Sequence, residues 1–163
     1  MARYTPDELE QWHFVPSITN LAAPTVAEVN AGEEVTGAII SVSGFKYTGT
    51  KVETPDLKSR FNKSVPGRFS AEDSSIQFYK GDEATDVEVI VEELLADDTA
   101  GYIVRIPPED GAPQTIAAAT TCAVWPVKIM SNTEDPPTPG EVAKFTVDFA
   151  IPRAPAKVAV IAA

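Results

Sequence analysis

The sequence predicts a mostly β protein, an antiparallel sandwich or barrel of two packed sheets with one flanking α-helix. Short apolar runs rich in β-branched and aromatic residues recur along the chain, and 14 prolines and 9 glycines separate them with turns. The stretch at about residues 85–97 has the apolar spacing of an amphipathic helix. A chain of 163 residues can bury one sizeable core, so residues 1–163 are expected to form a single domain.

The helix predicted over about residues 85–97 has an apolar stripe at positions i, i+4, i+7 and i+8. The stripe consists of Val87, Val91, Leu94 and Leu95. Thr85 is expected to cap the first turn, with Glu88 completing a capping box. Residues 87–89 also alternate as a strand would, but the alternation ends there, which favours the helix.

Seven further segments have the apolar content and the turn boundaries of short strands. They are residues 12–16, 34–46, 74–80, 102–106, 115–130, 141–151 and 158–161. The last of them belongs to a C-terminal strand segment, residues 152–163, that follows a proline break. Pro126 has no N–H to donate, so a bulge or a sheet edge is expected at this position. A second capping box, Thr25 with Glu28, predicts a short helical stretch.

Residues 47–73 are expected to form a long irregular loop, because prolines and glycines interrupt every apolar period there. From residue 44 to residue 70 there are six basic and two acidic side chains, a net charge of +4. The whole chain carries −11, so the remaining residues sum to −15. The basic side chains form either a solvated surface or an arm that docks on an acidic neighbouring copy. The candidates for such contacts are Lys51, Lys58, Arg60, Lys63 and Arg68.

Catalytic and cofactor motifs are missing from the sequence. There is no Gly-rich phosphate loop and no His-Glu-x-x-His, and one histidine with one cysteine cannot supply the usual zinc ligands. His13 is expected to be a packing residue and Cys122 a buried thiol. The acidic pairs 97–98 and 109–110 do not follow calcium-loop spacing and are expected in surface turns. The sequence thus predicts no enzyme and no metal or cofactor.

The composition also narrows the classes of partner. An isoelectric point near 4.4 argues against a general nucleic-acid binder, which would carry a basic patch. No apolar run approaches the roughly 20 residues that span a membrane. No signal peptide is expected in residues 1–4, which lead directly into a polar turn sequence, so folding in a cytoplasm is expected.

Four pieces of the sequence occur in a characteristic order. They are the opening Asn20–Gly32, the loop end Pro66–Gly67 before a strand and the helix, the strand start Thr99–Val104, and the loop and strand Pro136–Phe149. In this order, over about residues 12–161, they resemble the major tail tube protein of long-tailed (siphovirus-type) bacteriophages, particularly those of actinobacterial hosts.

The resemblance implies two packed antiparallel sheets with one helix, and six copies in a ring whose inner sheets close into a β-barrel. Rings would stack into a tube through which phage DNA passes without specific binding, and the long loop would reach the adjacent ring. The implied partners are the tail-tip, tape-measure and tail-terminator proteins, with no membrane involved. Such a protein belongs to the virion tail and is assembled in the host cytoplasm.

An acidic wall inside such a tube would repel the phosphates of DNA. The acidic excess lies outside residues 44–70, so strand positions elsewhere are the candidates for the lumen. These candidates are Ser75, Gln77 and Asp148.

A monomeric β-sandwich decoration or carbohydrate-binding module is the alternative function. It would need an exposed aromatic platform on which a sugar ring could stack. Trp12, Trp125 and Tyr102 lie on expected strands, which favours a place in the core. A binding module would also remain monomeric when concentrated, whereas a tube protein would form rings or filaments.

Overall fold

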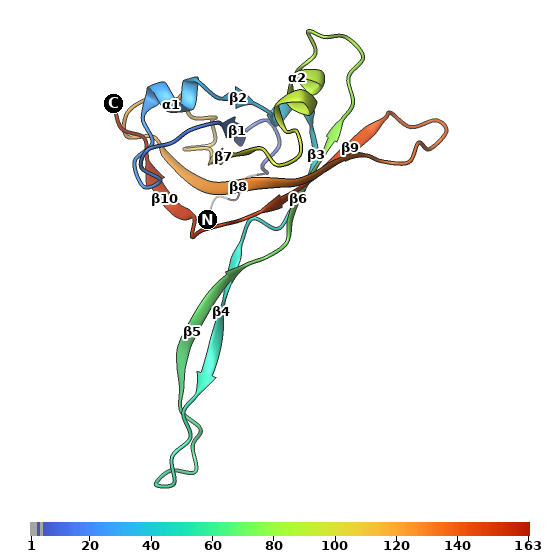
Figure 1. The fold of residues 1–163 in the computed structure, drawn as a ribbon. Coiled ribbons are helices and arrows are strands. Elements are labelled where there is room, and N and C mark those ends of the chain that lie inside the picture. The colour runs from blue at the N-terminus through green and yellow to red at the C-terminus, as the bar shows by residue number, and fades with distance from the viewer. Residues whose placement is uncertain (1–2, 4) are drawn as a thin grey trace.

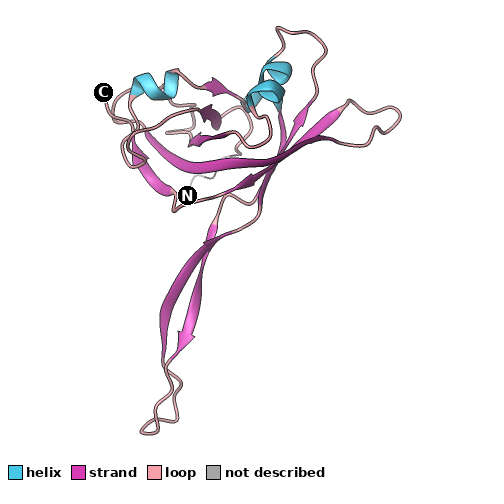
Figure 2. Ribbon diagram, viewed as in Figure 1, coloured by secondary structure: helices cyan, strands magenta, loops and turns pink. Residues whose placement is uncertain are grey.

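The computed structural model describes residue 3 and residues 5–163. Figure 1 shows a β body with a long hairpin extending from it, and strands predominate over helices (Figure 2). The mostly antiparallel β fold expected from the sequence is confirmed. Residues 1–2 and 4, where no signal peptide is expected, lie outside the described residues. No described helix is long and apolar enough to cross a membrane.

The described chain contains ten strands, two α-helices and one 3-10 helix. The strands are β1 (Gln11–Val15), β2 (Glu33–Glu34), β3 (Ile39–Ser43), β4 (Tyr47–Glu53), β5 (Ser64–Ala71), β6 (Ser74–Tyr79), β7 (Ala100–Ile106), β8 (Thr121–Glu134), β9 (Lys144–Ala150) and β10 (Ala156–Val160). The helices are α1 (Val26–Asn30), the 3-10 helix η1 (Thr36–Ala38) and α2 (Val87–Leu94).

Eight strands pair antiparallel in one sheet, in the order β2-β1-β7-β8-β9-β6-β3, with β10 attached to β8. β8 is 14 residues long and joins the two halves of this sheet. Its beginning pairs with β10 and its end with β9, so both lie along one edge of β8. Pro126 lies in the interval between the two, since β10 reaches Val124 and β9 reaches Lys128. Pro126 therefore faces a gap in the pairing on this side, and on the other side it lies opposite Tyr102 of β7.

An aromatic-rich cluster lies between the two halves of the sheet. Side chains of β1 and β7 pack there against side chains of β6 and β9, so the sheet folds over as a sandwich. Phe78 and Phe145 stack with ring centroids 5.2 Å apart, and Phe45 packs edge-on against Trp125 and Phe149. Each buried ring removes roughly 150–250 Å² from water, so these side chains supply a large part of the hydrophobic stabilisation.

A second cluster covers the opposite face of β7 and β8, beneath α1 and β10. Ile103 belongs to the first cluster and Val104 to the second, because successive side chains of a strand point to opposite faces. β7 is thus buried on both faces. Cys122 lies in this second cluster, as expected, and burial raises the pKa of its thiol to about 11.

The two expected capping boxes have different outcomes. In α1 the box is formed, with Glu28 N–H donating to Thr25 Oγ1 at 3.1 Å and Thr25 N–H donating to Glu28 Oε2 at 2.9 Å. In α2 the box expected of Thr85 and Glu88 is wrong, because the N-cap residue is Asp86. The Asp86 carboxylate accepts the N–H of Glu83 at 3.1 Å, so it closes the preceding turn rather than capping the helix.

The helix α2 is shorter than the expected 85–97, and its apolar stripe is buried in part. Val91 and Leu95 are fully buried, and Leu94 packs against the core from a half-buried position. Val87 is exposed. The helix therefore contacts the sandwich with its C-terminal half and leaves an apolar side chain of its first turn in solvent.

Two expected strands begin later than the sequence suggests. Residues 34–46 contain η1 before β3, because the Thr36 hydroxyl accepts the N–H of Trp12 at 2.8 Å and folds the chain back onto β1. The strand expected at 115–130 starts at Thr121 and continues to Glu134. Before it, the Thr120 hydroxyl donates to the carbonyl of Thr115 at 2.9 Å, and such bonds compete with strand pairing.

The irregular loop expected at 47–73 is wrong over most of its length, because β4 and β5 form an antiparallel hairpin there. Pairing runs from Tyr47 opposite Ala71 to Glu53 opposite Ser64, with a register shift between Gly49 and Lys51. A two-stranded ribbon exposed on both faces needs no apolar alternation, so the usual strand pattern is absent from its sequence.

Candidate assembly surfaces

The β4–β5 hairpin extends from the body on the side opposite to α2 (Figure 1). It carries all five basic candidates, which lie on the two strands and on the irregular tip, residues 54–63. Lys51 pairs with Glu53 at 3.3 Å, and Lys63 pairs with Asp56 at 2.7 Å, an interaction that lowers the pKa of the Asp56 carboxyl. No ion pair within residues 5–163 involves the other three, Lys58, Arg60 and Arg68.

Apolar side chains on the same hairpin are as exposed as its charges. Leu57 at the tip is fully exposed, and Phe61 beside it is 76% exposed. Val52 and Val65 face each other across the ladder and are about half exposed. These residues were not among the sequence candidates. The sequence feature that could have indicated them is the presence of apolar residues in a basic segment without helical or strand periodicity.

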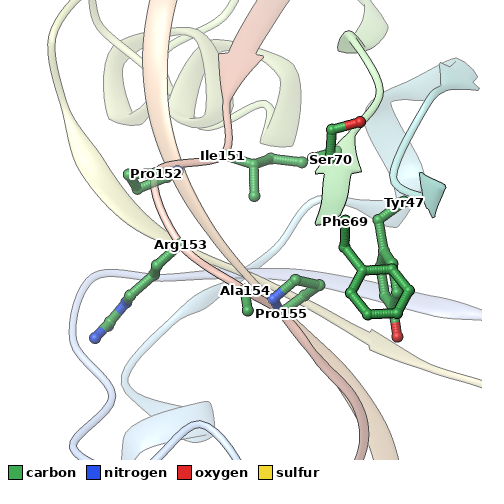
Figure 3. Close-up of a pocket in the computed structure, with 9 residues that line it drawn as sticks. Tyr47, Phe69, Ser70, Ile151, Pro152, Arg153, Ala154 and Pro155 are labelled. Atoms are coloured by element: carbon green, nitrogen blue, oxygen red, sulfur yellow. The ribbon is translucent and has the colours of Figure 1, made fainter. Parts of the chain in front are cut away.

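A pocket of about 430 Å³ lies where the hairpin joins the body. Figure 3 shows Tyr47 and Phe69 of the hairpin on one side and the turn between β9 and β10 on the other. Tyr47 packs edge-on against Phe69, with centroids 5.6 Å apart, and also contacts Trp125 of the core. This aromatic contact fixes the base of the hairpin to the sandwich.

The three lumen candidates lie on one polar layer formed by β3, β6, β9 and the end of β8. Ser75 is opposite Asp148, which is opposite Ser131 on β8, and Ser131 donates to Asp148 at 3.0 Å. Gln77 donates to Asp135 at 2.6 Å, and the Thr146 hydroxyl bonds the same carboxylate at 2.9 Å. The structure therefore brings Ser75, Gln77 and Asp148 together. Asp135, which follows β8, is a member of this layer that sequence reasoning missed.

The polar layer ends in two open edges within the described part of the chain. β3 is the last strand of the sheet on one side. On the other side, β7 pairs with β8 only as far as Lys128, so the final residues of β8 have no strand beyond them. A loop contact lies on one part of this edge, where Asn132 N–H donates to the Asp97 carboxylate at 2.7 Å.

The segment around α2 is strongly acidic. Residues 81–98 contain eight aspartates and glutamates and no basic residue. Lys80 lies 2.7 Å from Glu134 and 3.6 Å from Glu92, and these carboxylates, Glu134 first, raise the pKa of its ammonium group. Lys128 lies 3.8 Å from Asp98. The two lysines offset only part of the negative charge, so the α2 end of the body is acidic.

No group of three or more side chains that could hold a metal ion comes together among the described residues. His13 is buried on β1, where desolvation lowers its pKa, while Glu34 and Glu33 act in the opposite direction. It is a core residue, as expected.

A projecting hairpin and open sheet edges offer surfaces on which another chain can dock or pair. A family model described as phage tail tube protein matches residues 1–163, and the chain belongs to this family. No curated protein matches the chain.

Several solved structures have a similar fold. A chain of the anti-feeding prophage baseplate matches with a TM-score of 0.62 at 8% identity, covering 95% of each chain. A chain of the PVC sheath/tube terminator of an extracellular contractile injection system matches with a TM-score of 0.58 at 13% identity, covering 98% of this chain and 97% of that chain. A chain from the tail of an empty GTA particle matches with a TM-score of 0.54 at 13% identity, covering 96% of this chain and 98% of that chain. At these identities the likeness is one of fold.

Proposed function

We propose that this tail tube protein assembles into hexameric rings that stack into the conduit for phage DNA. The observation that carries the proposal is the polar four-stranded layer with an open edge at each side. Pairing of β3 in one copy with the end of β8 in the next would satisfy both edges, and a closed ring leaves no open ladder. The six-fold count is supported by the similar folds in structures computed with six-fold or C6 symmetry.

In this arrangement the polar layer faces the lumen. Ser75, Gln77 and Asp148 lie on it, and the carboxylates of Asp148 and Asp135 give it negative charge. A negative wall repels DNA phosphates, so the duplex passes without specific binding. The opposite face of the same strands contributes the aromatic core, which explains the alternation of polar and apolar residues along β6 and β9.

The hairpin extends beyond its own ring and contacts the adjacent one. Its basic residues, Lys51, Lys58, Arg60, Lys63 and Arg68, are placed on an arm that leaves the body, while the rest of the chain is acidic. The tail-tip, tape-measure and tail-terminator proteins would cap and fill the tube, in a virion tail assembled in the host cytoplasm. The resemblance of residues 20–32 and of the other three sequence pieces supports a source among siphovirus-type phages of actinobacterial hosts.

The alternative function, a monomeric decoration or carbohydrate-binding module, finds no open platform at Trp12, Trp125 or Tyr102. Trp125 is buried, and Trp12 is half-buried against Phe45, with centroids 5.7 Å apart. The Tyr102 ring lies 5.5 Å from the guanidinium carbon of Arg153, which covers it. None of the three aromatic residues presents an open ring to solvent.

Sedimentation and electron microscopy of the purified chain over a concentration series test the proposal. The expected result is a shift from monomers to rings and tubes as concentration rises. A strictly monomeric species at every concentration, alone and with the tail-tip proteins added, would contradict ring assembly and favour the binding module.

A further inference from the structure

The outer side of α2 presents two apolar side chains that the described chain covers only in part. Val87 and Ile90 are 38% and 36% exposed, and they lie three residues apart on the helix, with Glu93 three residues further. Residues at this spacing share one side of a helix. Val91 and Leu95 point to the core instead. We call Val87, Ile90 and Glu93, together with Glu83 in the preceding turn, the α2 ridge.

The ridge combines this apolar surface with negative charge. Glu83 and Glu93 are exposed, and no ion pair within the described chain involves either of them. The nearby lysines are engaged elsewhere, Lys80 with Glu92 and Glu134, and Lys128 with Asp98. A partner for this surface would therefore need apolar side chains flanked by positive charge.

The hairpin tip also combines apolar side chains with charge, and its charge is positive. Leu57 and Phe61 are its most exposed apolar residues, and Lys58 and Arg60 lie between them in the sequence. The tip lies at the far end of the ribbon, on the other side of the body from α2 (Figure 1). It therefore cannot reach the ridge of its own chain, whereas a copy placed end to end presents its ridge to the tip.

We propose that the hairpin tip of one copy docks on the α2 ridge of a copy in the next ring. Leu57 and Phe61 cover Val87 and Ile90, while Lys58 and Arg60 face Glu83 and Glu93. Such a contact joins two different surfaces, so it repeats along a stack without closing. The inference rests on the proposed function, because it names the partner surface of the hairpin.

The pocket at the hairpin base is a weaker receptor for the tip. It is lined by Tyr47, Phe69 and Pro155, but also by Arg153, whose charge has the same sign as the tip. It also lies at the hairpin end of the body, so a tip from an end-to-end neighbour would meet the α2 end first (Figure 1).

A charge exchange tests the contact. The tip variant carries Lys58→Glu and Arg60→Glu, the ridge variant carries Glu83→Lys and Glu93→Lys, and a third chain carries all four changes. Each of the first two should lower the mass of stacked tubes by about tenfold or more at low salt, because like charges then face each other. The chain with all four changes should form a mass of stacked tubes within about threefold of that of the unaltered chain.

Sedimentation measures stacking, and electron microscopy counts single rings. Exchange of an ion pair at the base of the hairpin, Lys46→Glu with Glu72→Lys, keeps the net charge and should stack normally. Leu57→Ser with Phe61→Ser should give single rings at every salt concentration. The proposal would be overturned if the ridge variant stacked normally. It would also be overturned if the chain with all four changes stacked no better than the tip variant. Failure of the unaltered chain to form rings would instead contradict the proposed function.

Discussion

At the scale of single residues, burial of His13 makes stability depend on pH. Desolvation lowers the pKa of His13 in the folded chain below its ordinary value of 6.5. Between the two pKa values the unfolded chain binds more protons, so the free energy of unfolding rises with pH in this window. The contribution is fully present above about pH 7 and is lost as pH falls below 6.5 towards the folded pKa.

Urea unfolding at about pH 7.5, 6.5 and 5.5 should show this decline in the free energy of unfolding. His13→Gln should flatten the curve over the same range, because glutamine does not titrate. Glu28, whose pKa is lowered by the backbone N–H groups of Thr25 and Thr19, loses its contribution at lower pH, as the carboxyl is protonated. An equal pH dependence in the variant would show that other groups control stability in this window.

Gly101 at the second position of β7 is a further test at this scale. A Cβ at this position would lie 2.7 Å from Cε2 of Phe14, a fully packed ring of the core. Gly101→Ala should therefore lower the free energy of unfolding by about 1–3 kcal/mol, as overpacking does. Gly37→Ala is the matched control, because no atom lies within 4 Å of its Cβ position. Equal effects of both changes in urea unfolding would disprove the packing argument.

At the scale of elements, the parts predicted well are those in which one face is buried. β6 and β9 have strict burial alternation, and the sequence pattern at 74–80 and 141–151 located both. The hairpin was missed because neither of its faces is buried, so pairing left no apolar period to detect. The close approach of the two strands requires glycine at position 67, since a Cβ on Gly67 would lie 2.6 Å from Thr50 Oγ1 on the facing strand.

The candidate surfaces show the same division. The charge contrast of the sequence located the basic arm, and alternation located Ser75, Gln77 and Asp148 on one layer. The exposed Leu57 and Phe61 could not be assigned, because the charge contrast indicates an arm but does not show which of its apolar side chains lack a core contact. Projection is a property of the three-dimensional arrangement of the hairpin and the sandwich.

The charges of the hairpin tip should contribute little to the thermal stability of the body. Reversing Lys58, Arg60 and Lys63 to glutamate should leave the melting temperature nearly unchanged, since exposed ion pairs contribute about 0–1 kcal/mol. Lys63 bonds Asp56 at 2.7 Å, so the tip should become more mobile while the ladder remains. Calorimetry reports the melting temperature, and microscopy should show no tubes. Tubes of normal length at low salt would show that these charges are merely solvated.

At the scale of the whole molecule, positive and negative charges lie at opposite ends. The basic hairpin extends to one side, the acidic α2 segment lies at the other, and the polar layer between them has its own carboxylates. Asp148 is the informative position on this layer, because it lies in the row of Ser75 and Ser131. A charge added at the lumen is presented by every copy towards the axis, whereas a charge added outside is dispersed over the surface.

Asp148→Lys should therefore change what the tube does with DNA while leaving assembly intact. Tubes of the unaltered chain should leave a short DNA duplex in the supernatant on sedimentation at low salt, whereas Asp148→Lys tubes should carry it into the pellet, because six lysines per ring would face the phosphates. Glu109→Lys, an exposed position in the turn after β7, adds the same charge away from this layer and is the control. Equal capture of DNA by both variants would show that total charge, and not a lumen-facing Asp148, governs the interaction, and the acidity of the chain would then serve solubility.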